Sequence, residues 1–315
     1  MNPFKQTKTS MKKAKLFPLF LLFISAFTAC NNDDDTTPEV AKPTMTNVEI
    51  GSANNKQGVI GRDFHFNADV TAGDKIAAVQ LKILPKKGEK YASDWKLELS
   101  WAEYVGAKNT TVHKHFNIPN EAPEGKYDFF FTVLDSNGSK LEIKEDFTIV
   151  DAANLPTDPL IGRDMISRNE TLIYHMGTWV EPELIFKKDD ILTAHAQISQ
   201  IKGDGILYSV LIKKSANYHP ESIDNLDFKK VIVISKVEHK GLAAASKIST
   251  LQKINDVWGG EKIVIGAATD ANLPNANPIT GEKAWESGVY NWVVLYKNTT
   301  YNLNVYKSMP ITINY

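Results

Sequence analysis

The chain has 315 residues, with 36 lysines and arginines against 37 acidic residues, and one cysteine. A net charge of −1 lacks the basic excess that nucleic-acid binding needs, so we expect no nucleic-acid partner. A single cysteine excludes an internal disulfide, and packed cores must stabilise the fold. The length favours two domains, and an aromatic content of 10% with few helical periodicities favours β-rich cores.

The N-terminal residues predict export. Five lysines precede the mostly apolar run 16–27, which is too short to span a bilayer comfortably. Thr28 and Ala29 are small residues directly before Cys30. This order resembles a bacterial lipoprotein signal, in which the cysteine is lipidated and becomes the mature N-terminus. A transmembrane anchor and an ordinary secretory signal cut elsewhere are the alternatives.

The residues after Cys30 predict where the protein works. The acidic run 31–35 resembles the surface-export signal of Bacteroidota lipoproteins. We expect residues 1–29 to be the signal peptide and residues 30–43 to be the lipidated cysteine with a flexible tether. The mature chain then has a net charge near −6, because the signal carries five lysines and no acid. The protein is expected to be anchored by lipid in the outer membrane and exposed at the cell surface.

Residues 44–150 predict a β-sandwich of about seven short strands. Alternating apolar residues and turn signals place these strands at 48–51, 63–71, 76–84, 95–101, 112–118, 125–134 and 141–150. Asn137-Gly138 suits the positive φ angles of a type I′ hairpin turn. Tyr127 follows a glycine at the start of the sixth strand, which is the tyrosine-corner position of immunoglobulin-like folds. We therefore predict an immunoglobulin-like sandwich.

Residues 151–160 contain two prolines and predict a linker, and residues 161–315 predict a second, longer sandwich. The segment 195–213 aligns without gaps on 65–83, and Gly203-Asp204 falls on Gly73-Asp74. The second domain is interpreted as a diverged copy of the first. The fold prediction is therefore all-β, with two tandem immunoglobulin-like β-sandwich domains.

The extra length of the second copy is expected between residues 215 and 287. Within it, apolar residues recur every third position over 240–254, which predicts a short helix. Residues 272–278 predict a turn-rich loop.

Three histidines of the first domain are candidate metal ligands. His113 and His115 are two residues apart on one strand, so their side chains share a face. His65 lies on the strand that would neighbour the strand of His113 and His115 in an immunoglobulin-like sheet. Imidazole nitrogens bind zinc, copper or nickel, and Asp69 on the face of His65 would add an oxygen ligand. The alternative is a set of solvated polar side chains. His195, the repeat equivalent of His65, has no such partners.

The segments 61–66, 109–119 and 123–127 together resemble an uncharacterised family of Bacteroidota lipoprotein domains. That family is known only as a domain of unknown function with an immunoglobulin-like fold. Its members are often rich in histidine at these positions and commonly add one in the strand after the Gly-x-Tyr. Here that strand is Asp128-Phe-Phe-Phe131, without the extra histidine. The resemblance covers the first domain well and the second loosely, and it implies location and fold, with no established activity.

Other motifs indicate no enzyme. Neither a Gly-x-Ser-x-Gly nor a His-Glu-x-x-His sequence occurs, and residues 258–260 lack the Lys-Ser or Lys-Thr of a phosphate loop. A metallohydrolase would need a general base beside the metal, which the sequence does not reveal. Trp258 and Trp285 flank polar loops and would offer indole faces to a sugar or a protein.

We therefore predict a non-enzymatic surface lipoprotein that captures zinc or copper through the first domain and feeds an outer-membrane transporter. The alternative is a glycan- or protein-binding adhesion module that uses loops of the second domain and recognises a surface glycan. Apart from these partners, the membrane is expected to hold the protein through its N-terminal lipid.

Overall fold

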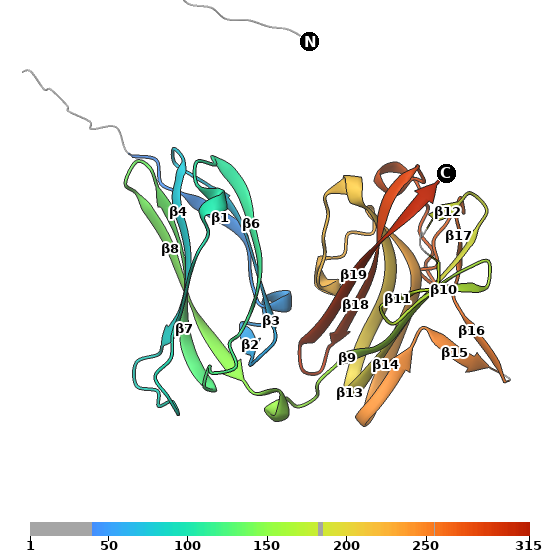
Figure 1. Ribbon diagram of the computed structural model, residues 1–315, viewed down its shortest axis with the longest axis horizontal. Coiled ribbons are helices and arrows are strands. Elements are labelled where there is room, and N and C mark those ends of the chain that lie inside the picture. Colours follow the sequence, from blue (N-terminus) through green and yellow to red (C-terminus); the bar gives the residue numbers. More distant parts are fainter. Residues whose placement is uncertain (1–39, 182–184, 255) are drawn as a thin grey trace, which may run out of the picture. The chain divides into compact units, whose positions relative to one another are not determined.

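The computed structural model describes residues 40–181, 185–254 and 256–315. Within these ranges the regular elements are β-strands and short 3-10 helices, so the predicted all-β class is confirmed (Figure 1). The predicted signal peptide, Cys30 and most of the tether lie outside the described residues. Among the residues that the structure describes, no helix has the length and hydropathy needed to cross a membrane.

The N-terminal sandwich contains eight strands. They are β1 (Thr44–Ile50), β2 (Gln57–Val59), β3 (Asp63–Thr71), β4 (Ile76–Pro85), β5 (Leu97–Ser100), β6 (Asn109–Asn117), β7 (Gly125–Asp135) and β8 (Lys140–Val150). The 3-10 helices η1 (Ser52–Asn54), η2 (Ala102–Tyr104) and η3 (Ala152–Asn154) connect or follow them. One sheet has the order β1-β3-β6 and the other the order β2-β8-β7-β4-β5. The sequence did not predict β2, because three residues are too few to show alternation.

Aromatic side chains fill the space between the two sheets. Phe64 and Phe66 of β3 are buried, and the Phe66 and Phe131 ring centroids are 4.4 Å apart. Tyr127 donates a 2.7 Å hydrogen bond from its Oη to the carbonyl of Pro123, four residues upstream. This is the tyrosine-corner bond expected for the fold. Because β3 must present its phenylalanines to this core, its intervening residues point to the opposite face of the sheet.

The second group of strands forms one curled sheet. Its strands are β9 (Leu160–Arg168), β10 (Thr171–His175), β11 (Thr178–Trp179), β12 (Ile185–Lys187), β13 (Ile191–Lys213), β14 (Val231–Ser249), β17 (Ile263–Val264), β18 (Gly288–Asn298) and β19 (Leu303–Asn314). A separate hairpin pairs β15 (Leu251–Ile254) with β16 (Val257–Gly260). The 3-10 helices here are η4 (Lys214–Ala216), η5 (Ile223–Asn225) and η6 (Gly281–Lys283).

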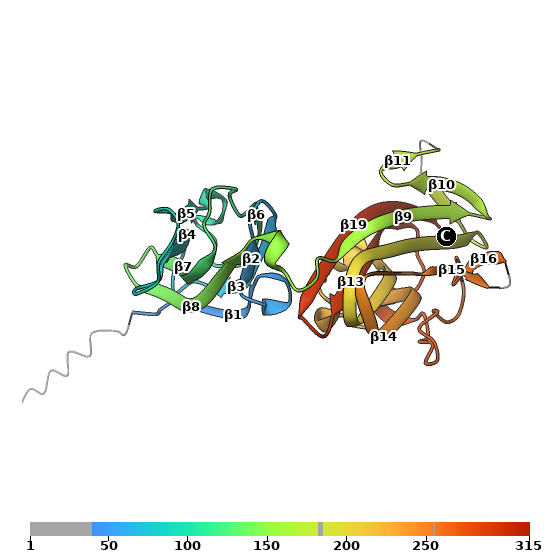
Figure 2. The ribbon, with the colours of Figure 1, turned by 90° about the horizontal axis from the view of Figure 1, so that it is seen from below.

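The long strand β13 makes the sheet curl (Figure 2). Residues 192–199 pair with β9, residues 205–213 pair with β18, and β14 follows the opposite edge of β13. Gly203 has φ of 75° and lies between register shifts, which is the geometry of a β-bulge. The aligned Gly-Asp pairs therefore differ in structure. In the N-terminal sandwich Gly73 does separate two strands, but here the chain bends and continues as one strand.

The helix predicted over 240–254 is wrong. These residues belong to β14 and to the β15 strand that follows it. β14 begins with five consecutive buried residues, 231–235, and pairs with β13 from Ile212 back to Gln197. Because β14 pairs with β13 over this length, these residues form a strand although their apolar residues recur at every third position, as in a helix. The turn-rich segment 272–278 forms no strand, as predicted.

Residues 214–230, called here the covering segment, lie over the outer face of β13, β14 and β18. Tyr218, Ile223 and Leu226 pack against buried residues of these strands, which include Val210 and Val233. The outer face of this sheet is thus also packed, which explains why the second half of the chain needs more residues than the first.

Replacing Tyr127 by phenylalanine tests the tyrosine corner. The variant leaves the buried carbonyl of Pro123 without its donor, so we expect a loss of about 1–3 kcal/mol of unfolding free energy. Urea denaturation measures this loss. Tyr290, whose Oη donates a 3.1 Å bond to the carbonyl of Glu286, is the matched position in β18. An unchanged midpoint for Tyr127→Phe would contradict a structural role for this bond.

Candidate metal centre

The pairing of β3 with β6 brings three histidines together. In the antiparallel register His65 lies opposite His115, and Asn67 lies opposite His113. The imidazole centroids are 5.1 Å apart for His65 and His113 and 5.2 Å apart for each of the other two pairs. The register therefore gathers on one sheet the three histidines that the sequence pattern singles out.

Glu221 of the covering segment completes this group. Its Oε1 lies 2.9 Å from His115 Nε2 and 3.3 Å from His113 Nε2, and its Oε2 lies 2.9 Å from His65 Nδ1. One ligand atom from each of the four residues can be chosen so that all lie within 4.8 Å of one another. Four ligand atoms around a single zinc ion, with bonds of about 2.0–2.2 Å, would lie roughly 3.3–3.6 Å apart. The group needs only small adjustments to reach that geometry.

Local contacts hold Glu221 in place. Pro220 before it and Ser222 after it are both buried. Ser222 caps η5 by accepting a 3.2 Å hydrogen bond from the Asp224 backbone N–H. The Oη of Tyr218 accepts a 2.7 Å bond from the backbone N–H of Asp227, which closes the covering segment on itself. The Glu221 carboxylate is thus positioned by a packed segment of the second half of the chain.

Two further carboxylates contact the outer nitrogens of the imidazoles. Asp63 Oδ2 lies 2.6 Å from His115 Nδ1, and Glu49 Oε2 lies 3.6 Å from His65 Nε2. Glu49 is itself oriented by a 2.7 Å bond from the Ala53 backbone N–H. A histidine that binds a metal usually donates its other ring nitrogen to a carboxylate or carbonyl, which fixes its orientation and tautomer. His115 has this arrangement with Asp63, and His65 Nε2 faces Glu49 at ion-pair distance.

His65 shows how well the site suits a cation. Its side chain is 6% exposed, and its buried Nδ1 makes no hydrogen bond to the described residues, although Glu221 Oε2 is 2.9 Å away. A buried nitrogen without a hydrogen bond costs free energy unless another partner satisfies it. The chemistry of this donor set, three imidazoles and one carboxylate, matches a transition-metal site.

The charges in the cluster depend on one another. Burial lowers the pKa of His65, but the carboxylates of Glu221 and Glu49 outweigh it and raise that pKa to about 9. The hydrogen bond to Glu221 raises the pKa of His115 to about 9 against the effect of burial, with Asp63 adding to the rise. Burial raises the pKa of Glu221, yet its close contacts with His113, His115 and His65 hold that pKa well below its usual range. Without a metal, protons on the imidazoles balance the carboxylates.

Asp69, also predicted as a ligand, is not part of this cluster. Its carboxylate accepts hydrogen bonds of 2.7 Å from Asn47 Nδ2 and 2.6 Å from Thr111 Oγ1. Asp69 lies opposite Thr111 in the register, two pairs beyond Asn67 and His113 on the side away from His115. Its hydrogen-bonding capacity is used within the β1-β3-β6 sheet.

The tryptophans predicted to bind a glycan or a protein differ in position. Trp285 is half-buried, packs against the core, and donates a 2.9 Å hydrogen bond from Nε1 to the carbonyl of Ala267. That geometry assigns Trp285 to the packing of the core formed by the nine-stranded sheet. Trp258 lies in β16, but its side chain is outside the described part of the chain.

Glu221, Asp63 and Glu49 were missed by the sequence reasoning. Glu221 lies 106 residues after His115 in a segment with no periodic pattern. Asp63 precedes His65 by two residues on the same strand, so the alternation of β3 could have identified it.

Comparison with known proteins finds a family model that is similar to the first part of the chain. Residues 28–150 match the model of DUF4625, a domain of unknown function. All three histidines, Asp63 and Glu49 lie within the matched residues, whereas Glu221 lies outside them. The chain matches no curated protein.

Two solved structures show limited similarity. Dimeric latent PorU from Porphyromonas gingivalis is 11% identical over 89% of this chain and 21% of that chain, with a TM-score of 0.29. The native conformation of E. coli alpha-2-macroglobulin is 11% identical over 87% of this chain and 16% of that chain, with a TM-score of 0.23. The chain spans between about a sixth and a fifth of the length of these proteins.

The ion pairs predict how the metal-free protein responds to pH. Because folding raises the pKa of His65 and His115 from 6.5 to about 9, their stabilising effect is complete below pH 6.5 and is lost as pH rises through about 9. Denaturation in the presence of a chelator should therefore show a falling unfolding free energy across this window. The double variant His65→Gln with His115→Gln should flatten the fall, and the exposed His219→Gln should not. A pH-independent stability would contradict the ion pairs.

Proposed function

We propose that this protein binds a divalent transition metal, zinc or copper, through His65, His113, His115 and Glu221. The observation that carries the proposal is the convergence of four ligand atoms, one from each residue, within 4.8 Å of one another. Imidazole nitrogens prefer zinc and copper to magnesium or calcium, which take oxygen ligands. The single carboxylate adds a charged oxygen to this nitrogen-rich set.

The surrounding charge supports a dication. When the imidazoles are neutral, as metal binding requires, the carboxylates of Glu221, Asp63 and Glu49 leave an excess of negative charge around the site. A divalent cation neutralises this excess directly. The same ion would satisfy the buried His65 Nδ1, which has no hydrogen bond to the described residues.

Metal capture without catalysis fits this ligand set best. Four protein ligands fill a tetrahedral zinc site, whereas catalytic zinc keeps one position for water or substrate. Since the histidines come from β3 and β6 and Glu221 from the covering segment, a bound metal would also join the two halves of the chain. We further propose that the protein is a lipoprotein anchored through Cys30 at the outer surface of the outer membrane, where it would pass metal to a transporter.

Removing ligands tests the site. The purified protein, stripped with a chelator and dialysed against zinc or copper, should bind close to one equivalent, as measured by elemental analysis and calorimetry. Glu221→Ala, and His113→Ala combined with His115→Ala, should each weaken binding by more than about 100-fold, because losing an outer-sphere partner alone costs 10–100-fold. His219→Ala is the matched control, since this exposed histidine lies two residues from Glu221 outside the cluster. Equal affinity in the double variant would overturn the proposal.

The carboxylate behind His115 gives a finer test. Asp63→Asn keeps the ligands but weakens the hold on His115 Nδ1, so zinc affinity should fall by about 10–100-fold. Asp69→Asn on the same strand is the control, because Asp69 bonds Asn47 and Thr111 and does not contact the cluster. Calorimetry with zinc compares the two variants. Equal affinities would show that Asp63 does not orient a ligand.

A further inference from the structure

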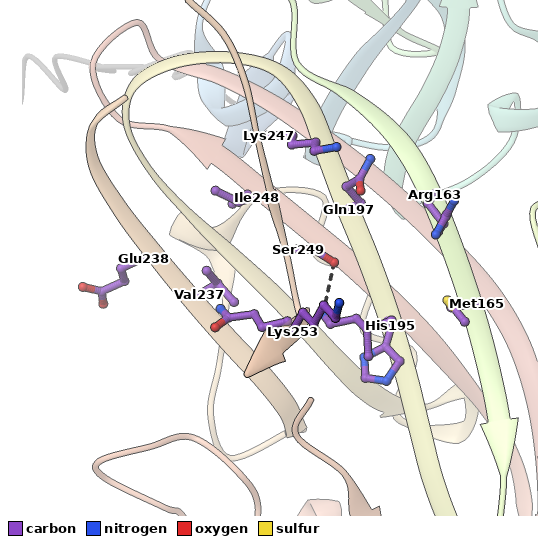
Figure 3. Close-up of a pocket in the computed structure, with 12 residues that line it drawn as sticks. Arg163, Met165, His195, Gln197, Val237, Glu238, Lys247, Ile248, Ser249 and Lys253 are labelled. Carbon is purple, nitrogen blue, oxygen red and sulfur yellow. Dashed lines mark hydrogen bonds between the residues drawn. The ribbon is translucent and has the colours of Figure 1, made fainter. Parts of the chain in front are cut away.

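A second site lies in the second half of the chain, apart from the histidine cluster. A cavity of about 480 Å³ opens between the outer face of β9, β13 and β14 and the β15 strand that crosses it (Figure 3). Its wall consists of Arg163, Met165, His195, Gln197, Val237, Glu238, Lys247, Ile248, Ser249, Leu251, Gln252 and Lys253. Cavities of this size accept small organic ligands.

Strand register explains how Arg163, Met165, His195, Gln197 and Ser249 share one face of the sheet. Arg163 of β9 and Ser249 of β14 lie on either side of Gln197 in β13, as cross-strand partners. Met165 lies opposite His195 in the next pair on the same face. The opposite face of β13 faces the core, where Ala194 and its neighbours are buried. These residues therefore form one surface across three paired strands, whereas Ile248, opposite the core residue Ile198, packs against the core from the other face.

The cavity has an excess of positive charge. Arg163, Lys247 and Lys253 line it, and Glu238 is its one acidic residue. Glu238 is paired with Lys236, and Lys253 with the exposed Asp256 at 3.0 Å. Arg163 and Lys247 form no ion pair with any residue of the described ranges. Figure 3 shows both at the same end of the cavity, on either side of Gln197.

The other end of the cavity is apolar and closed by a neutral histidine. Met165, Ile248 and Leu251 contribute apolar walls. His195 is 7% exposed, and its burial lowers the pKa of the ring, which favours the uncharged form. Its Nδ1 lies 3.4 Å from Thr250 Oγ1.

Gly260 allows β16 to approach His195 closely. A Cβ atom at Gly260 would lie 2.5 Å from His195 Cε1, so a side chain there would force the ring or the strand to move. Gly260 thus has a packing role beside this cavity.

We propose that this cavity binds a small anionic amphiphile of the fatty-acid class. Its carboxylate would lie between Arg163 and Lys247, and its chain would extend along Met165 and Leu251 toward His195. A charged head suits the two cations that lack ion pairs, and an apolar chain suits the walls behind them. This site does not depend on the metal site.

Calorimetry with decanoate, below its micelle concentration, tests the proposal in the purified protein. Decanoate should bind, and Arg163→Gln combined with Lys247→Gln should weaken it at least tenfold. Decanol, which has the same chain without the charge, should bind at least tenfold more weakly than decanoate. Lys240→Gln, an exposed lysine of β14 outside the cavity, is the control and should not change decanoate binding.

A second variant distinguishes a loss of decanoate binding from a loss of folding. Gln197→Trp fills the middle of the cavity without changing its charge and should abolish decanoate binding while zinc affinity at the histidine cluster stays unchanged. Equal binding of decanol and decanoate would overturn the role of the cations. Binding of glucuronate in place of decanoate would overturn the apolar part and indicate an acidic sugar. Binding of none of these ligands would refute the site.

Discussion

The burial of the Glu221 carboxylate among three imidazoles is the constraint on which the site depends. A buried charge without a partner is strongly unfavourable, so this carboxylate must be balanced by positive charge. Either protons on the histidines or a bound cation can supply that charge. The short contacts to His65 and His115 show that the surrounding chain is organised around this requirement. The covering segment packs against its sheet, and this packing places the Glu221 carboxylate beside the imidazoles.

The core of the N-terminal sandwich positions the other half of the site. Phe64 and Phe66 are buried between the two sheets, and this burial fixes which face of β3 carries His65. A register slip of one residue would turn His65 toward the core and expose the phenylalanines, so hydrophobic packing specifies the placement of the imidazole. Packing energy that stabilises the fold therefore also determines the geometry of the cluster.

The alternation of apolar and polar residues along the sequence was enough to predict the strands that carry the histidines. The strands that carry His65, His113 and His115 could be located from the spacing of apolar residues, and an immunoglobulin-like topology made them neighbours. Glu221 could not be predicted, because no local pattern links a residue in an irregular segment to a sheet 106 residues earlier. Asp69 was predicted from its face alone, whereas the register places it opposite Thr111. At 240–254, backbone pairing along β13 determined a strand despite a helix-like spacing.

Anomalous diffraction at the zinc absorption edge, from crystals grown with zinc, tests the central claim most directly. The account predicts one strong peak bonded at about 2.0–2.2 Å to nitrogens of His65, His113 and His115 and to a carboxylate oxygen of Glu221. The absence of a peak there, with Glu221 still buried among the three imidazoles, would contradict metal binding. The cluster would then be a set of ion pairs that joins two parts of the chain.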